Sequence, residues 1–478
     1  MEKYEAVIGL EVHAQLNTKS KIFAADDTAF GAEPNTQVSP ITLGLPGVLP
    51  KFNETVLEKA VKLGLALGCT ISEESHFDRK NYFYADLPKG YQISQDKIPV
   101  CIGGSVEIEV NGVRKQIALN RIHMEEDAGK NNHELDPDFS LIDLNRAGVP
   151  LLEIVSEPDI RSGDEAYAYL TEIRRLVRYL DVCDGNMEEG SLRCDANISI
   201  RLKGETKLNT RVEVKNMNSI RNVKRAIENE IKRQVELVET GGQVEQETRS
   251  FVPADGSSFT LRSKEHAHDY RYFPEPDLPP VVITAEKIEA IRSSMPALPK
   301  KLFQQFTTEF HLSDYDANVL IDEKEIADYF LELTRISKHY KSAANWVMGE
   351  IKSHLNENNL AIAAFSIKPE KIAEIISMVE ENKISSSSAK SIFNALLQQP
   401  SKTAEQLAAE LNLLQSSDLS ELNQWAEQAL AMYPEKVLEY KKGKKGLLGL
   451  FMGELMKISK GKADPKLSSK LLEELLNK

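Results

Sequence analysis

The alternation of apolar and polar residues predicts a β-rich first half of the chain. It is clearest in residues 6–16, where every even-numbered position is apolar. Because the side chains of a strand alternate between its two faces, Glu11 and His13 project from the same face, about 6–7 Å apart. Further strand-like runs cover residues 116–124, 191–201 and 210–215. We therefore expect a sheet with an apolar face against a core and a polar face that carries acidic groups.

Turn and capping residues delimit the other elements of this half. Asn111-Gly112 favours the type I′ turn of a β-hairpin. Three helices are expected, namely residues 54–67, residues 164–181 after the cap Ser162, and Ser219 to about Thr240 before Gly241-Gly242. Prolines interrupt residues 266–280, so we expect irregular structure there.

The stretch of residues 141–155 combines strand-forming residues with Asp143, Asn145, Arg146 and Glu153. A Gly-Val-Pro sequence separates two halves of strand length, and we interpret them as two short strands joined by a turn. A buried carboxylate needs a partner or a metal ion. A structural Asp–Arg pair inside a sheet and a functional site are therefore both open interpretations.

From about residue 285 the apolar residues recur with a period of 3.6, which predicts helices. We expect an α+β protein with three parts: a β-rich, mostly antiparallel domain (residues 1–290), a helical domain (291–400) and a small helical unit (401–478). The serines at 385–388 are interpreted as a helix–helix turn, and residues 398–401 as a hinge.

Length and charge narrow the class of protein. At 478 residues the chain is too long for a single core, and its net charge of −14 argues against general nucleic-acid binding by the main body. We find no apolar run of membrane-spanning length and no signal peptide, and we expect a cytoplasmic protein. The four cysteines form no Cys-x-x-Cys pair, so we expect reduced thiols and no zinc site.

The polar strand faces and the strand ends gather acidic and imidazole groups, which are Glu11, His13, Glu125, Glu126, Asp195 and Glu213. Carboxylates that converge in one sheet need a cation to neutralise them. An oxygen-rich set with one imidazole suits Mg²⁺ or Mn²⁺ better than Zn²⁺. Arg193 and Arg211 on the same faces could bind phosphate oxygens. The pattern is typical of a phosphoryl-transfer site, although strand faces that merely meet solvent would look the same.

Two familiar catalytic motifs are missing from the sequence. There is no Gly-x-x-x-x-Gly-Lys-Ser/Thr, which argues against an ordinary P-loop. There is also no Gly-x-Ser-x-Gly, and we see no cysteine nucleophile signature. Hydrolytic amidase chemistry is therefore not expected in this chain.

The C-terminal part has the opposite charge to the rest. Residues 436–470 contain ten lysines and three acidic residues, a net charge of +7, so the remaining residues sum to −21. Lysines without arginines favour phosphate contacts over readout of bases. We expect this segment to bind the backbone of an RNA; the alternative is a solvated helical face.

Seven long motifs together resemble one known family. They are Val7-Ile-Gly-Leu-Glu-Val-His13, Phe77-Asp-Arg-Lys-Asn-Tyr-Phe-Tyr84, Tyr91-Gln-Ile-Ser94, His123-Met-Glu-Glu-Asp-Ala-Gly-Lys130, Asp143-Leu-Asn-Arg-Ala-Gly-Val-Pro-Leu-Leu-Glu153, Glu188-Glu-Gly-Ser-Leu-Arg-Cys-Asp-Ala-Asn197 and Asp269-Tyr-Arg-Tyr-Phe-Pro-Glu-Pro276. With Gly461-Lys-Ala-Asp-Pro465 in the tail, the match spans essentially the whole chain. It resembles the B-subunit family of the bacterial aspartyl/glutamyl-tRNA(Asn/Gln) amidotransferases.

The resemblance implies a ligase of protein biosynthesis that acts on mischarged tRNA. In this family ATP and Mg²⁺ activate the side-chain carboxylate of Glu-tRNA(Gln), and often of Asp-tRNA(Asn), and ammonia then displaces phosphate. It also implies a heterotrimer, in which a glutaminase A subunit supplies ammonia through a tunnel and a small C subunit ties A to B. The tRNA is expected on a cradle-shaped N-terminal domain and on the tail.

The resemblance also assigns residues. It implies metal ligands at Glu11, His13, Glu126, Asp195 and Glu213, with Glu125 close by. The expected catalytic residues are Glu126, Lys89 and Glu125, of which Lys89 and Glu126 match positions at the entrance of the ammonia tunnel. On physical grounds more than on the match, Ser191 and Arg193 are the candidates for contact with ATP or its phosphates, and Glu189 is added to them.

Two other functions use the same features. An RNA-binding scaffold could hold Mg²⁺ structurally, and it would release no ADP in response to glutamyl-tRNA. A two-metal nuclease or nucleotidyltransferase could use the same carboxylates, but it would cut or extend RNA.

Overall fold

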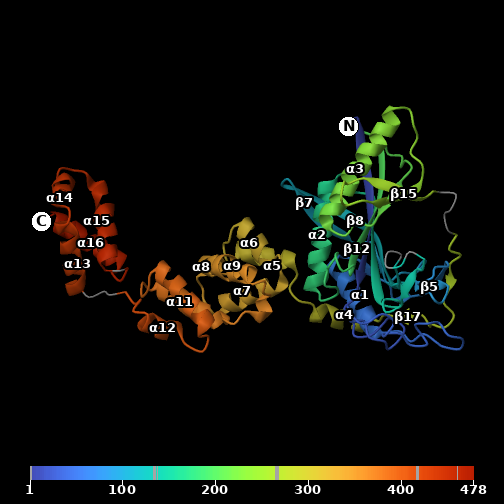
Figure 1. Ribbon diagram of the computed structural model, residues 1–478, viewed down its shortest axis with the longest axis horizontal. Coiled ribbons are helices and arrows are strands. Elements are labelled where there is room, and N and C mark those ends of the chain that lie inside the picture. Colours follow the sequence, from blue (N-terminus) through green and yellow to red (C-terminus); the bar gives the residue numbers. More distant parts are fainter. Residues whose placement is uncertain are drawn as a thin grey trace. The chain divides into compact units, whose positions relative to one another are not determined.

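The computed structural model describes residues 3–132, 136, 138–263, 269–415, 419–459 and 461–477. The chain divides into two compact units, with the break after Leu298. One large sheet dominates the first unit and helices make up the second (Figure 1), so the chain is an α+β protein, as expected. The domain boundaries at residues 290 and 400 stay predictions.

The large sheet carries the strands that the alternation predicted. Its order is β15-β14-β13-β12-β1-β11-β8-β6-β2, with β7 also paired to β8, and only the β13–β14 pair is parallel. The strands are β1 (Tyr4–Gln15), β2 (Thr70–Ile71), β6 (Cys101–Ile102), β7 (Ser105–Val110), β8 (Val113–Glu126), β11 (Pro150–Ser156), β12 (Leu192–Leu202), β13 (Val212–Lys215), β14 (Glu247–Phe251) and β15 (Ser258–Ser263). The β7–β8 hairpin turns at Asn111 and Gly112, whose positive φ angles of 53° and 77° fit the expected type I′ turn.

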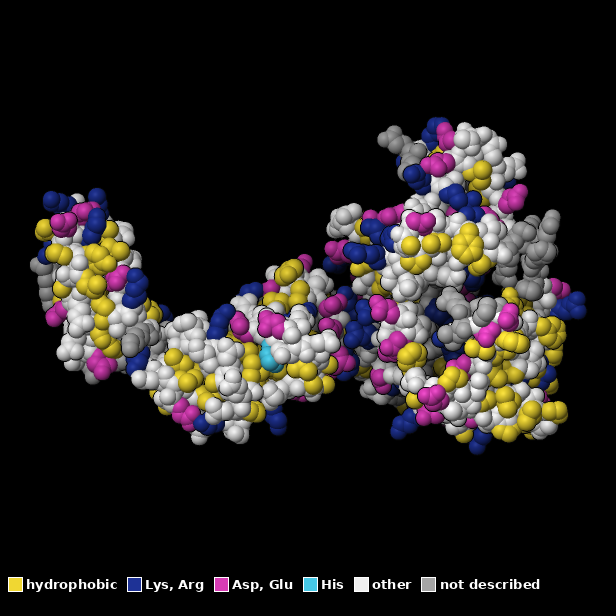
Figure 2. Space-filling view, viewed as in Figure 1, with side chains coloured by type: hydrophobic (Ala, Val, Ile, Leu, Met, Phe, Trp, Pro, Cys, Tyr) yellow, Lys and Arg dark blue, Asp and Glu magenta, His cyan; other side chains and the backbone are white. Residues whose placement is uncertain are grey.

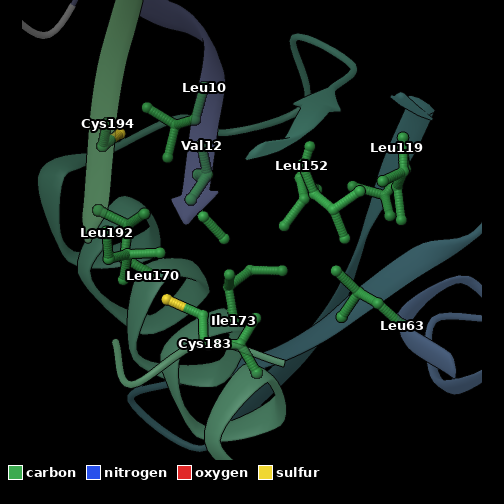
Figure 3. Close-up of a cluster of buried hydrophobic side chains, with 14 of the residues drawn as sticks. Leu10, Val12, Leu63, Leu119, Leu152, Leu170, Ile173, Cys183, Leu192 and Cys194 are labelled. Carbon is green, nitrogen blue, oxygen red and sulfur yellow. The ribbon is translucent and has the colours of Figure 1, made fainter. Parts of the chain in front are cut away.

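One face of this sheet is covered by helices. They are α1 (Glu54–Ala66), α2 (Gly163–Tyr179) and α3 (Ile220–Glu239), and α4 (Ala285–Ser294) packs on α1. The three expected helices are thus confirmed, and their first turns are capped by the side chains of Asn53, Ser162 and Ser219. Leu10 and Val12 of β1 and Ile173 of α2 belong to the same core (Figure 3). Because the even-numbered residues of β1 fill this core, the odd-numbered ones face away from the helices.

Three smaller sheets flank the large one. They are the three-stranded β16-β4-β5, formed by β16 (Phe273–Pro274), β4 (Asp78–Asn81) and β5 (Tyr91–Ser94), and the two pairs β17 (Val281–Val282) with β3 (Glu74–Ser75) and β10 (Leu141–Asp143) with β9 (Lys130–Asn132). The expectation of irregular structure at residues 266–280 is wrong at β16, because its backbone pairs with Arg79 and Asp78. Residues 266–268 lie outside the described part of the chain.

The stretch 141–155 forms two strands, but they do not pair with each other. β10 pairs with β9, whereas β11 lies between β1 and β8. The connection is held to a distant loop, since Leu144 N donates to Asn35 Oδ1 (2.8 Å) and Gln37 N to Asn145 Oδ1 (2.9 Å). Arg146 pairs with the buried Asp127 at 3.5 Å, so this stretch does take part in an Asp–Arg pair, although its aspartate lies outside residues 141–155.

The second unit is helical. It contains α5 (Pro299–Thr308), α6 (Asp314–Leu320), α7 (Lys324–Ile336), α8 (Tyr340–Trp346), a π-helical turn (Val347–Ile351), α9 (Lys352–Glu357), a 3₁₀ turn (Ile362–Ala364), α10 (Pro369–Glu380), α11 (Ser386–Gln398), α12 (Ala404–Glu410), α13 (Leu419–Ala431), α14 (Pro434–Lys441), a 3₁₀ turn (Lys445–Leu447), α15 (Leu448–Ile458) and α16 (Pro465–Asn477). The interpretation of residues 385–388 as a turn is wrong, because Ser385 caps α11 by accepting from Ser388 N, and the other serines form its first turn. None of the helices in the described ranges has the length and apolar character needed to cross a bilayer.

Candidate active site

The register of the large sheet aligns polar side chains in rows across its uncovered face. His13 of β1 lies opposite Glu153 of β11, which lies opposite His123 of β8. On the other side of β1, Glu11 lies opposite Asp195 of β12. These pairings join strands that are distant in sequence, and they gather carboxylates and imidazoles on what we call the polar face.

The first cluster on this face, the His13 group, consists of His13, His123, Glu125 and Glu153. Glu153 Oε2 lies 3.3 Å from His13 Nε2 and 3.1 Å from His123 Nε2. Glu125 is 3.8 Å from His13 and 3.7 Å from His123, and it accepts a hydrogen bond from Ser94 Oγ at 3.1 Å. Each carboxylate therefore contacts both imidazoles.

The imidazoles and carboxylates of the His13 group shift the pKa values of one another. Burial alone would lower the pKa of His13 and His123, but the carboxylates of Glu153 and Glu125 raise both to about 9. Burial would likewise raise the pKa of Glu153, yet the two imidazoles hold it well below its ordinary value. His123 Nδ1 is buried without a hydrogen-bond partner among the described residues. The group thus holds two carboxylates charged in a protected place.

The second cluster, the Glu11 group, consists of Glu11, Asp195, Glu213 and Lys215. Lys215 Nζ forms ion pairs with Asp195 and, at 3.0 Å, with Glu213. Asn197 donates to Glu11 Oε1 at 3.0 Å. Burial and the neighbouring carboxylates Glu153, Asp195 and Glu213 raise the pKa of Glu11. Three acids around one lysine leave an excess of negative charge, which a further cation would relieve.

Both groups have the donor set of a divalent metal site. One ligand atom from each of His13, Glu125 and Glu153 lies within 4.8 Å of the others, and the same holds for Glu11, Asp195 and Glu213. Carboxylate oxygens with at most one imidazole suit Mg²⁺ or Mn²⁺. The residues therefore fit such ions in two adjoining places. Four of the five expected ligands fall in these sets: Glu11, His13, Asp195 and Glu213.

The fifth expected ligand, Glu126, lies elsewhere. Since neighbours in a strand point to opposite faces, Glu125 joins the His13 group and Glu126 turns away from it. Glu126 forms an ion pair with Lys89 and accepts from Ile93 N at 2.8 Å. Both line a pocket together with Lys21 and Phe23. The structure thus brings together Lys89 and Glu126, the expected pair at the ammonia entrance, and separates Glu126 from both candidate metal groups.

Lys21 is the most buried cation of this pocket. Its side chain is 1% exposed, and its amine donates to the carbonyl oxygens of Gln37 (2.8 Å) and Leu144 (3.4 Å). Burial lowers its pKa to about 8, although Asp26 and Glu126 oppose that shift. Lys21 therefore ties two loops to the pocket wall. No sequence signal pointed to it, because it belongs to no strand or motif.

The three expected ATP contacts lie at different distances from the clusters. Arg193 is in the row of His13, on the opposite strand, and donates to Asp127 Oδ2 at 3.0 Å. Ser191 precedes β12 and its hydroxyl donates to Asp184 and to Asn186 O (3.0 Å). Glu189 is exposed in the preceding turn. Only Arg193 borders the clusters directly, and the roles of all three stay predictions.

Glu153 and His123 of the His13 group were not among the expected site residues, whereas Glu125 was expected as a catalytic residue. Glu153 stands in Leu151-Leu-Glu-Ile-Val155, where the alternation puts it on the polar face, and His123 lies two positions before Glu125. Both signals are present in the sequence. What the sequence lacks is the pairing of β11 with both β1 and β8, and only this pairing makes the two residues neighbours of His13.

A hollow lies beside the Glu11 group. It is lined by Gly9, Glu11, Asn197, Ser199 and Arg211, among others. The exposed Arg211 was expected on the polar face near phosphate. Its place on the rim of this hollow keeps that role open.

The lysine-rich C-terminal part folds as its own helical bundle. The core of α13–α16 includes Leu422, Tyr440, Phe451 and Leu472. Figure 2 shows Lys and Arg side chains at the end of the bundle where α14 and α15 meet. The four lysines between 441 and 445 lie at the end of α14 and in the connection that follows it. Lys460 lies outside the described residues.

Comparison with known proteins decides the family. The model of the GatB/GatE catalytic domain matches residues 6–289, and that of the GatB domain matches residues 328–476. The chain belongs to the GatB family, the B subunits of aspartyl/glutamyl-tRNA amidotransferases. Relatives of that name occur in Thermodesulfovibrio yellowstonii (49% identical, 99% of both chains) and Geotalea uraniireducens (50%, 99% of this chain and all of the other). The one in Geobacter sulfurreducens is 50% identical over 99% of both chains.

Membership in the GatB family confirms the resemblance inferred from the motifs. It also confirms the enzyme class, an ATP-dependent ligase of the tRNA amidotransferase type that belongs to protein biosynthesis. The family name designates a subunit, so the amidotransferase has several subunits, and tRNA is implied as its substrate. The scaffold and nuclease interpretations lose their support.

Proposed function

We propose that this chain is the subunit that activates and amidates the amino acid on mischarged tRNA. Its substrates would be Glu-tRNA(Gln), Asp-tRNA(Asn) or both. ATP would convert the side-chain carboxylate into an acyl-phosphate, and ammonia would convert that into the amide. The observation that supports this best is the adjoining His13 and Glu11 groups on one face of the sheet.

The two groups supply what phosphoryl transfer requires. Mg²⁺ or Mn²⁺ held by Glu11, Asp195 and Glu213, and by His13, Glu125 and Glu153, would neutralise the oxygens of the transferred phosphoryl group. Lys215 occupies the Glu11 group, so it would shift toward phosphate when a metal ion binds. Arg193, held by Asp127 at 3.0 Å, has further N–H groups for a phosphate oxygen.

The reaction has two chemical steps, phosphorylation of the carboxylate and then its amidation. A carboxylate oxygen of the glutamyl side chain bonds to the γ-phosphorus of ATP, and the bond to the ADP oxygen breaks. The nitrogen of ammonia then attacks the carbonyl carbon, phosphate leaves with the electrons of the carbon–oxygen bond, and the nitrogen loses one proton. Glu126, which pairs with Lys89 at the pocket where ammonia would arrive, would receive this proton.

Water must be excluded while the acyl-phosphate exists, because it hydrolyses readily. The aromatic segment 77–94 lies beside the His13 group, where Ser94 donates to Glu125. We infer that this segment forms the wall. Ammonia would reach the acyl-phosphate from a glutaminase A subunit through the Lys89–Glu126 pocket. A small C subunit would join the A subunit to this chain. The lysine-rich α13–α16 bundle would bind the tRNA backbone.

The test measures ADP release by this chain assembled with its A and C subunits. We expect ADP and glutaminyl-tRNA only when glutamyl-tRNA(Gln) and Mg²⁺ are both present. The same test with aspartyl-tRNA(Asn) then decides whether this tRNA is also a substrate. A complex that binds either mischarged tRNA but consumes no ATP would refute the proposed function. The variant Glu109→Gln serves as a surface control and should behave as the wild type. Glu109 is exposed on the β7–β8 hairpin and pairs with Arg114.

A further inference from the structure

Four tyrosine rings form a continuous series beside the His13 group. We call Tyr82, Tyr84, Tyr270 and Tyr272 the tyrosine ladder. Ring centroids are 6.0 Å apart for Tyr84–Tyr82, 5.9 Å for Tyr82–Tyr270 and 6.2 Å for Tyr270–Tyr272, with interplanar angles of 68–72°. The rings come from two segments far apart in sequence. Such edge-to-face spacing is that of interacting aromatic rings.

The ladder has a rigid base. Asn81 N donates to Tyr270 O at 2.9 Å, and its side-chain amide donates to Arg271 O at 2.8 Å. Close by, β16 pairs with β4, with Phe273 opposite Arg79. The two tyrosine-bearing segments are therefore joined backbone to backbone, so the rings are positioned before any ligand arrives.

The ladder is not part of the core. Tyr84 is 56% exposed and Tyr272 is 38% exposed, and both keep large apolar faces in contact with solvent. A cation lies among the rings, since Lys80 Nζ is 4.8 Å from the ring centroid of Tyr270 and 5.8 Å from that of Tyr82. Burial alone would lower the pKa of Lys80, but Glu125 and Glu153 raise it. The strand that carries Lys80, β4, pairs with β5, and Ser94 of β5 donates to Glu125 at 3.1 Å. The ladder therefore lies close to the His13 group.

We propose that the tyrosine ladder binds the unpaired nucleotides at the 3′ end of the aminoacylated tRNA. This proposal rests on the proposed function and adds where the 3′ end of the tRNA binds. Unpaired bases stack on exposed aromatic rings regardless of their sequence, and Lys80 supplies a positive charge for the phosphates between them. The amino acid is esterified to the terminal ribose, so bases held here bring its side chain to the His13 group.

The experiment compares two uncharged tRNAs in binding to the complete amidotransferase, one intact and one lacking its unpaired 3′ nucleotides. We expect the wild type to bind the intact tRNA about tenfold more tightly or better, because stacking strengthens binding about 5- to 150-fold per base. Tyr272→Ala and Tyr84→Ala should lose most of this ratio. The matched variants Tyr272→Phe and Tyr84→Phe should keep it, since they retain the ring.

Three outcomes would overturn the proposal. They are a wild type that binds both tRNAs equally, alanine variants that keep the full ratio, and alanine variants that instead weaken assembly with the A or C subunit, which would make the ladder a protein interface. Both tested rings are exposed, so the variants should keep the thermal unfolding temperature of the wild type. Binding needs no ATP, so a complex with the expected ratio but without tRNA-dependent ADP release would refute the proposed function alone.

Discussion

At the scale of single residues, the candidate site depends on one carboxylate shared by two imidazoles. Glu153 contacts His13 and His123 across two strand pairs. One of its carboxylate oxygens also lies within 4.8 Å of a carboxylate oxygen of Glu125. Its removal would change both the charge and the donor set of the His13 group. It is therefore a better test of that group than His13, which is the outermost of the four.

We predict that Glu153→Gln lowers tRNA-dependent ADP formation by about 100-fold, the usual effect of removing one key electrostatic group. The amide keeps the shape but lacks the charge, so tRNA binding should be unchanged. Single-turnover measurement of ADP with the assembled enzyme checks this. Glu109→Gln is the control and should behave as wild type. An equal fall in tRNA affinity in Glu153→Gln would mean that the residue is merely structural.

The buried Lys21 gives a prediction for pH. Its folded pKa of about 8 lies below the ordinary value of 10.5, so between these values the unfolded chain binds a proton that the folded chain does not. Stability from this residue therefore rises with pH across that window. The difference in unfolding free energy between wild type and Lys21→Met should grow in favour of wild type from pH 8 to pH 10. Urea unfolding at both pH values checks it; a constant difference would contradict the assignment.

At the scale of elements, the close packing of α1 against the sheet supports the strands that carry the polar face. α1 reaches the sheet at Gly64, where an added Cβ would lie 2.4 Å from Cys101 Sγ and 2.9 Å from Ile71 Cδ1. Cys101 belongs to β6, which pairs with β8, the strand of His123 and Glu125. A disturbance at this contact therefore reaches the site through one strand pair.

We predict that Gly64→Ala destabilises the protein by about 1–3 kcal/mol, as overpacking does in well-packed cores. Chemical denaturation measures it. The matched control is Gly349→Ala in the π-helical turn, where an added Cβ meets nothing within 4 Å; there, lower entropy of the unfolded chain should leave stability unchanged or slightly higher. Equal effects of the two substitutions would show that the α1–β6 contact is not tight.

At the scale of the whole molecule, charge is divided between an acidic body and a basic end. The +7 of residues 436–470 contrasts with the −21 of the rest, and several tail lysines already serve intramolecular pairs, such as Lys436 and Lys444 with Glu439. Lys441 and Lys442 lie at the end of α14, where basic side chains gather (Figure 2). These two are therefore the best probes of an RNA contact.

We predict that changing Lys441 and Lys442 together to Gln weakens tRNA binding and reduces the slope of log affinity against log salt by about one for each phosphate that is no longer bound. Because the lysines would bind the backbone, affinity should fall equally for different tRNA sequences. Salt titrations of tRNA binding measure it. Lys383→Gln with Lys402→Gln, both in surface ion pairs of the helical unit, is the control. An unchanged salt slope would favour a merely solvated face.

Much of the fold followed from local patterns, whereas the site followed from them only in part. The period of two at residues 6–16 and the Asn111-Gly112 turn predict β1 and the β7–β8 hairpin, because strand faces and turn geometry are local properties. Glu126 was expected as a ligand from the resemblance, whereas the alternation along β8 puts Glu125 on the polar face with His123. What no local pattern contains is the register with β11 that brings these residues to His13. The meeting of Tyr82 with Tyr270 depends on the β4–β16 pairing in the same way.

The most direct test of the account locates Mn²⁺ in crystals of the assembled enzyme by its anomalous scattering. We predict two peaks on the polar face, one among His13, Glu125 and Glu153 and one among Glu11, Asp195 and Glu213, and the disappearance of the first peak in Glu153→Gln. Mn²⁺ bound at Glu126 instead, or no peak at either group while the enzyme still consumes ATP, would contradict the claim that this face is the phosphoryl-transfer site.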